Sequence, residues 1–200
     1  MALLRRACAG TACNRGPRAG PRAWLVAAAA LLGATVGLSA QGARAAEYHI
    51  KAVFLFNFAQ FVDWPANAFS APQTPLVIGV LGEDPFEGFL DQTVADERLG
   101  GRPFQVRRYQ SVDEIQTCHI LFISRPAADR PEAMLAALKN RPILTVSDAA
   151  GFAERGGMIR FVTEQNRIRL QVNLAAVEAA HLTLSSKLLR VAEIVTPTGR

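Results

Sequence analysis

The chain is poor in the residues that build disulfide frameworks and metal centres. Its 200 residues include three cysteines and three histidines. The histidines, His49, His119 and His181, lie far apart, and no H-x-x-x-H or C-x-x-C spacing accompanies them. The sequence therefore favours neither a metal site nor a disulfide scaffold.

Familiar catalytic motifs are absent as well. The chain has no G-x-S-x-G elbow for a nucleophilic serine. Cys118 and His119 are neighbours on an expected strand, so their side chains leave opposite faces and cannot act as nucleophile and base. Gly79 and Gly82 lack the G-x-G-x-x-G series and the G-K-[ST] ending of nucleotide-binding loops. We expect no enzyme activity and no cofactor, although a site assembled from distant residues would leave no such motif.

Residues 1–45 contain no acidic residue and six of the 22 Lys and Arg residues. A basic start, an apolar run at residues 24–38 and the small-x-small sequence Ala43-Arg44-Ala45 are typical of a secretory signal peptide. We predict cleavage after Ala45. A retained membrane anchor is the alternative, but the apolar run of 15 residues is shorter than the roughly 20 that a span needs.

Removal of this segment reverses the sign of the net charge. The full chain carries +5, whereas residues 46–200 keep all 17 acidic residues and 16 basic ones, a formal charge of −1. The basic excess that would suggest a nucleic acid or an anionic membrane as partner thus belongs to the signal peptide. We expect no nucleic-acid partner and no membrane insertion after cleavage. Residues 46–200 suffice for a single domain.

Cys118 is the one cysteine that remains after cleavage, so no internal disulfide can form. It opens an apolar run of strand length, which predicts that the thiol is buried.

The first segment of the mature chain, residues 46–65, predicts an apolar helix that ends before Pro65. Its wide apolar face indicates packing against a core rather than a docking surface or ligand cleft. The residues of this face are Ile50, Phe54, Phe58 and Phe61, and the narrower polar stripe opposite comprises His49, Asn57, Gln60 and Asp63.

Short apolar runs then alternate with helical segments. Strands are predicted at residues 76–81, 104–109, 119–123 and 143–146, and helices at residues 85–90, 131–140 and 147–153. Asp84 is expected to cap the first of these helices, and Ser147 or Asp148 the third. Arg107 and Arg108 are expected to be solvated charges near the sheet edge. This series favours an α/β fold, a compact sandwich with a mostly parallel central sheet and helices on both faces.

The alternation ends with a late antiparallel hairpin. Residues 158–162 and 167–172 are predicted strands separated by four residues, 163–166. Asn173 is expected to cap a helix at residues 174–181, and Ser185 or Ser186 to begin a last helix that reaches Ile194.

Five segments, in this order and spacing, resemble the YfiR-like periplasmic family from about Tyr48 to Val195. They are KAVFLFNF at residues 51–58 with Trp64-Pro65; IGVLG at residues 78–82 with Asp84-Pro85-Phe86; CHILFI at residues 118–123; LTVSD at residues 144–148 with GGMI at residues 156–159; and Asn173-Leu174 with SKLL at residues 186–189.

The resemblance implies a regulator without catalysis. YfiR-like proteins bind the periplasmic sensor part of an inner-membrane diguanylate cyclase and repress it, and an OmpA-like outer-membrane lipoprotein can sequester the repressor. When the repressor is sequestered, the level of cyclic di-GMP in the cytoplasm rises and biofilm formation follows. The family fold is a compact α/β sandwich that tends to dimerise, so a homodimer is expected. Redox control through an internal disulfide is not expected, because Cys118 has no partner in the mature chain.

Two locations for binding follow from the sequence. The outer face of the hairpin, with Arg167 and Arg169 on the second strand and Glu164 in the turn, is a candidate partner surface. An ordinary solvated charged edge is the alternative interpretation. A periplasmic small-ligand-binding protein is the competing function, with its groove at the C-terminal ends of the parallel strands near Gly82, Ser124 and Ser147.

Overall fold

The computed structural model describes residues 21–128, 131–165 and 167–197, and residues 21–40 by their backbone alone. The chain forms two compact units, Met1–Gly42 and Ala43–Arg200. Helix α1 (Pro21–Phe61) contains the described residues of the first unit and the opening residues of the second. The basic start of the predicted signal peptide lies outside the described residues. The predicted cleavage site after Ala45 lies within α1.

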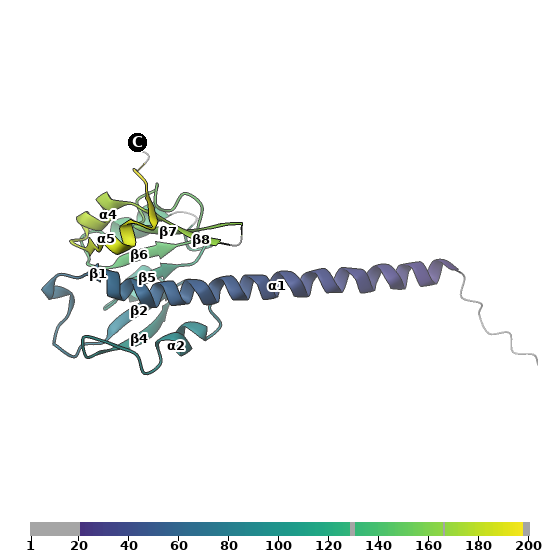
Figure 1. Cartoon of the computed structure of the whole chain (residues 1–200), viewed down its shortest axis with the longest axis horizontal. Coiled ribbons are helices and arrows are strands. Elements are labelled where there is room, and N and C mark those ends of the chain that lie inside the picture. The colour runs from purple at the N-terminus through teal and green to yellow at the C-terminus, as the bar shows by residue number, and fades with distance from the viewer. Residues whose placement is uncertain (1–20, 129–130, 166, 198–200) are drawn as a thin grey trace, which may run out of the picture. The chain divides into compact units, whose positions relative to one another are not determined.

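Eight strands of the second unit form its central sheet, in the order β10-β8-β7-β6-β5-β2-β4-β3 (Figure 1). Strands β4, β2, β5, β6 and β7 run parallel to one another. Strand β3 is antiparallel to β4, and β8 is antiparallel to β7 but parallel to β10. The mostly parallel α/β sheet with a late hairpin is thus confirmed. The strands are β2 (Leu76–Leu81), β3 (Arg98–Leu99), β4 (Arg102–Tyr109), β5 (Ile120–Ile123), β6 (Leu144–Ser147), β7 (Ile159–Glu164), β8 (Arg167–Val172) and β10 (Ala192–Ile194). A separate pair joins β1 (Val62–Asp63) to β9 (Thr183–Leu184).

Helices cover both faces of this sheet. Because successive strand residues point to opposite sides, Ile120 and Phe122 contribute to one apolar cluster and Leu121 and Ile123 to another. The first cluster includes residues of α1, α2 (Phe89–Val94), α4 (Leu174–Ala179) and α5 (Ser186–Leu189). The second includes residues of the segment around α3 (Pro131–Ala137) and Phe152. Cys118 belongs to the second cluster, which confirms its predicted burial.

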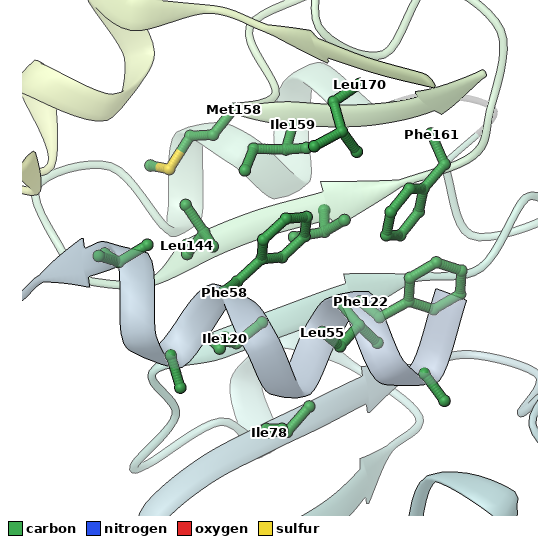
Figure 2. Close-up of a cluster of buried hydrophobic side chains, with 14 of the residues drawn as sticks. Leu55, Phe58, Ile78, Ile120, Phe122, Leu144, Met158, Ile159, Phe161 and Leu170 are labelled. Carbon is green, nitrogen blue, oxygen red and sulfur yellow. The ribbon is translucent and has the colours of Figure 1, made fainter. Parts of the chain in front are cut away.

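The first helix covers the sheet as predicted, and of its predicted apolar face Phe58 is buried while Phe54 and Phe61 pack partly buried against the core. Leu55 and Phe58 point into the sheet toward Ile78, Ile120 and Phe161 (Figure 2). Ile50, expected on the apolar face, is 49% exposed, and Val53 is 42% exposed. The buried stripe instead comprises Tyr48, Lys51, Ala52, Leu55, Phe58, Ala59 and Val62. The prediction was wrong for Ile50 and did not include Lys51 among the buried residues.

Two helices do not form where they were predicted, because the residues expected to cap them make other contacts. Asp84 Oδ1 accepts a hydrogen bond from the Phe86 amide at 2.8 Å, but α2 begins only at Phe89. Gly88, with φ of 81°, is left-handed backbone that a helix cannot continue through. The predicted helix at residues 147–153 is a series of turns, because the Asp148 side chain is buried against other charges instead of capping.

The chain end also differs from the prediction. The expected last helix stops at Leu189, and residues 192–194 form β10, which pairs in parallel with Leu170–Val172 of β8. The hairpin turn is shorter than expected, because Thr163 and Glu164 pair with Ile168 and Arg167. Asn166, within this turn, lies outside the described residues. The predicted cap by Asn173 is confirmed, since its Oδ1 accepts the Ala176 amide at 3.1 Å.

The buried face of α1 can be tested by paired truncations. Leu55→Ala should lower the free energy of unfolding by about 2–5 kcal/mol, because it removes a fully buried side chain from the core. Ile50→Ala, on the exposed side, should cost less than about 1 kcal/mol. Urea unfolding followed by circular dichroism measures both. Equal losses would contradict the orientation of the helix.

Candidate functional site

The C-terminal edge of the parallel strands is where ligands usually bind in doubly wound sheets, where the strand order reverses. Strand β2 lies between β4 and β5, so the reversal falls beside β2. The predicted solute groove at Gly82, Ser124 and Ser147 belongs to this edge.

These three residues are packed together rather than open. The fully buried Ser147 hydroxyl donates to the Ile123 carbonyl at 2.7 Å and accepts the Ala149 amide at 3.1 Å. Ser124 is 4% exposed, and a Cβ placed on Gly82 would lie 2.5 Å from its Oγ. Two cavities among the described residues lie elsewhere, one of about 110 Å³ near α3 and α4 and one of about 360 Å³ near the start of β5. A solute groove at this edge therefore stays a prediction.

A buried ion pair between Lys51 and Asp148 occupies the edge instead. Lys51 Nζ lies 2.5 Å from Asp148 Oδ2, and their side chains are 0% and 1% exposed. The Tyr48 hydroxyl donates to the same oxygen at 2.9 Å, and the Lys51 ammonium lies 4.3 Å from the centre of the Tyr48 ring. Asp148 directly follows β6, so the pair attaches α1 to the end of a central strand.

The ion pair continues outward in two directions. Lys51 Nζ also lies 2.5 Å from Glu47 Oε1, which accepts a hydrogen bond from the Thr163 hydroxyl of β7 at 2.8 Å. On the other side, the guanidinium of Arg125, 57% exposed, lies 3.2 Å from Asp148 Oδ2. Asp148 Oδ1 is buried and has no hydrogen-bond partner among the described residues. We call Glu47, Tyr48, Lys51, Arg125 and Asp148 the edge network.

In this network, the charged and hydrogen-bonding partners lower the pKa of each carboxyl group by more than burial raises it. Burial alone would raise the pKa of Asp148, but the hydrogen bond and charge of Lys51, with Tyr48 and Arg125, lower it below its ordinary value. The pKa of Glu47 is lowered in the same way, against burial, by Lys51 and Thr163. Burial and the Asp148 charge raise the pKa of Tyr48 to about 12. Both carboxylates are therefore ionised and the phenol is neutral at pH 7.

The edge network was not predicted from the sequence, although two signals point to it. Lys51 lies three or four residues from Tyr48 and Leu55, on the side of the helix that becomes buried. Asp148 directly follows an apolar strand that should be covered on both faces. Two opposite charges at buried positions require each other as partners.

The residues of the predicted partner surface lie together on the sheet face opposite α1. Glu164 pairs with Arg167, and Arg169 Nε lies 3.6 Å from Glu164 Oε2. Their side chains are exposed, Arg169 by 69% and Glu164 by 57%. A ladder continues this face across β7, β8 and β10, since Arg160 donates to Gln171 at 2.9 Å and Gln171 to Glu193 at 3.1 Å. We use the name outer hairpin face for Arg160, Glu164, Arg167, Arg169, Gln171 and Glu193.

Arg108, predicted to be a solvated charge, is instead a bridge between elements. Its guanidinium binds the carboxylates of Asp84, at 2.8 Å, and Asp91 of α2. The prediction was wrong because the two acids converge only once α2 packs beside β4. The arrangement fixes α2 and leaves Arg108 unsuited to partner binding.

Within the described parts of the chain, no three His, Cys, Asp or Glu side chains are grouped so that they could hold a metal ion. Among the same residues, no helix is both long and apolar enough to cross a membrane.

Removal of one member of the buried pair should destabilise the folded protein strongly. Lys51→Met should lower the free energy of unfolding by about 3–5 kcal/mol, because Asp148 is left buried without its cation. The double variant Lys51→Met/Asp148→Leu should recover much of this loss, since apolar residues of similar volume can replace a buried pair. Urea unfolding measures all three proteins. A loss below about 1 kcal/mol for Lys51→Met would contradict the assigned pair.

The same comparison gives a pH dependence. Because the pKa of Asp148 is lowered in the folded state, its stabilisation is present above the unfolded value of about 3.9 and is lost as the pH falls through the folded value. The stability of the wild type should therefore fall more steeply than that of the double variant below about pH 4. Unfolding midpoints measured from pH 7 downward test this, and parallel curves would count against it.

Comparison with known proteins gives the family. A comparison with curated proteins gave no match. The model of the YfiR/HmsC-like family matches residues 48–193, which include the edge network apart from Glu47, the outer hairpin face and the central sheet apart from Ile194. The chain belongs to the YfiR/HmsC-like family.

Proposed function

We propose that this protein binds the periplasmic sensor part of an inner-membrane diguanylate cyclase and represses it, which lowers cyclic di-GMP and biofilm formation. Membership of the YfiR/HmsC-like family supports a regulatory role in diguanylate cyclase signalling. The family is regulatory and non-catalytic, so we assign no catalytic residue. The identity of the partner and the sign of the effect are parts of the proposal.

The proposal includes export to the periplasm, the compartment of this family. The composition of residues 1–45 supports a signal peptide that is removed after Ala45. The mature chain would then begin at Ala46, directly before Glu47 and Tyr48. These two residues belong to the edge network, so cleavage at this position would retain every side chain that holds α1 on the sheet.

The observation that carries the binding surface is the uncovered polar sheet face of the hairpin. Glu164, Arg167 and Arg169 are exposed there, whereas the opposite face of the same strands packs Phe161 and Leu170 against α1. A rigid face with one buried side can present charges to a partner at fixed spacing. Thr163, bonded to Glu47, connects this surface to the edge network.

Homodimer formation and capture by an OmpA-like outer-membrane lipoprotein complete the proposal. The end of the sheet supports self-association, because β10 is an edge strand and offers one side of its backbone for pairing. Two exposed apolar side chains, Val191 at 69% and Ile194 at 48%, lie at this edge. Sedimentation of the purified protein would measure the oligomeric state.

Charge reversal on the outer hairpin face tests the surface. Arg167→Glu/Arg169→Glu should reduce recovery of the cyclase in a pull-down from membranes by at least about tenfold, because two attractive contacts become repulsive. Cellular cyclic di-GMP should rise correspondingly. The exposed pair Lys187→Glu/Arg190→Glu in and next to α5 changes the net charge equally and should leave recovery unchanged.

Two outcomes of this experiment argue against the proposal. Undiminished recovery by the hairpin variant would remove the binding surface while leaving the partner in place. Failure of the wild-type protein to recover any membrane protein with a cyclase domain would remove the partner itself.

A further inference from the structure

The N-terminal edge of the sheet contains a cavity that the proposed function does not use. Its volume of about 360 Å³ lies within the range of about 300–1,000 Å³ typical of small-molecule sites. Three segments line it: residues 67–74 before β2, residues 116–118 before β5 and residues 140–143 before β6. The edge network lies at the opposite edge, where such folds usually bind ligands.

The wall formed by residues 67–74 is held in place by two independent contacts. The His119 ring accepts the Val77 amide at Nδ1 at 3.0 Å, so its Nε2 carries the proton and donates to the Ala68 carbonyl at 3.1 Å. Arg102 donates to the Ala71 and Thr74 carbonyls at 2.7 and 3.2 Å. Phe69 lies between them, 4.4 Å from the His119 ring and 4.0 Å from the Arg102 guanidinium. A cavity with such a fixed wall is formed before any ligand arrives.

Arg141 is the charged residue of the lining. Its Nη2 donates to the carbonyls of Ile115 and Gln116 at 2.6 and 3.3 Å, which fixes the guanidinium. A guanidinium has five N–H donors in one plane. Nε and Nη1 form no hydrogen bond within the described parts of the chain, so they remain for a ligand. Because Nε–H lies on the Nη2 side of the guanidinium, Nε and Nη1 donate along different edges, and each can give one charge-assisted hydrogen bond to a carboxylate oxygen.

The rest of the lining combines polar and apolar side chains and contains no acidic residue. Burial raises the pKa of the Cys118 thiol at the cavity floor to about 12, while the charges of Arg141 and Arg107 act in the opposite direction. Two cations therefore influence the floor. The neutral hydrogen-bonding side chains of the lining are Asn67, Ser70, Thr74, Gln116, Thr117 and Asn140.

We propose that this cavity binds a small hydroxylated carboxylate, such as a sugar acid or a hydroxy acid. The carboxylate would pair with Arg141, and the amide and hydroxyl side chains would exchange hydrogen bonds with the ligand hydroxyls. A cation would meet Arg141 without a counter-charge, and an apolar ligand would leave the Arg141 donors unused. Solute binding at this edge goes beyond cyclase repression and gives the protein a site for a periplasmic metabolite.

Isothermal titration of the purified protein with gluconate and malate tests the site. Saturable binding of at least one acid is expected, whereas glucose, the uncharged counterpart of gluconate, should not bind. Arg141→Gln should weaken binding by at least about tenfold, because the paired charge is lost. Lys139→Gln removes an exposed charge two residues away and should change the affinity less than about twofold.

A second variant separates loss of the site from loss of the fold. Thr117 is exposed and lines the cavity, so Thr117→Trp should fill it and abolish binding while the unfolding midpoint stays near that of the wild type. Absence of binding by both acids at about 10 mM would overturn the proposal, as would unchanged affinity of Arg141→Gln. Either result leaves the cyclase pull-down unaffected, so the two proposals fail separately.

Discussion

The buried pair of Lys51 and Asp148 is the interaction on which the arrangement of this domain depends. It places a charge from the first helix at the end of a central strand, in a position from which water is excluded. Neither charge could be buried alone, because desolvation would cost several kcal/mol. The pair therefore selects one position of α1 on the sheet. Through Glu47 and Thr163 the same contact reaches the hairpin, so the helix, the strand end and the hairpin are positioned together.

The surface of the domain has regions that suit different kinds of binding partner. The C-terminal edge of the sheet holds the edge network and the close packing of Ser124 against Gly82. The outer hairpin face is flat, charged and exposed, which suits a protein partner more than a solute. The cavity beside Arg141 lies at the opposite edge and has the size of a small-molecule site. In the two proposals, partner recognition and solute recognition would therefore use separate parts of one sheet.

The sequence predicted the strands and their parallel order well, because each central strand is a short apolar run bounded by turn residues, as at Leu76–Leu81. It did not predict the edge network, since period and hydrophobicity assign a lysine to solvent. Only the partner carboxylate 97 residues later makes Lys51 a buried residue. The last strand was missed for a related reason: residues 192–194 pair with the free edge of β8, a contact that local helix preference does not register. Arg167 and Arg169 were placed correctly on one face because a period of two fixes which side chains of a strand share a face, whereas Glu164, predicted in the turn, belongs to β7.

Site-specific crosslinking tests the central functional claim, that the hairpin is the partner surface of this regulator. A photo-crosslinking residue placed at Gln165, in the exposed turn of the hairpin, would be compared in living cells with one at Ala133, on the exposed side of α3. The account predicts a crosslink from position 165 to an inner-membrane protein with a cyclase domain, and none from position 133. A crosslink to the cyclase from position 133 alone would contradict the account.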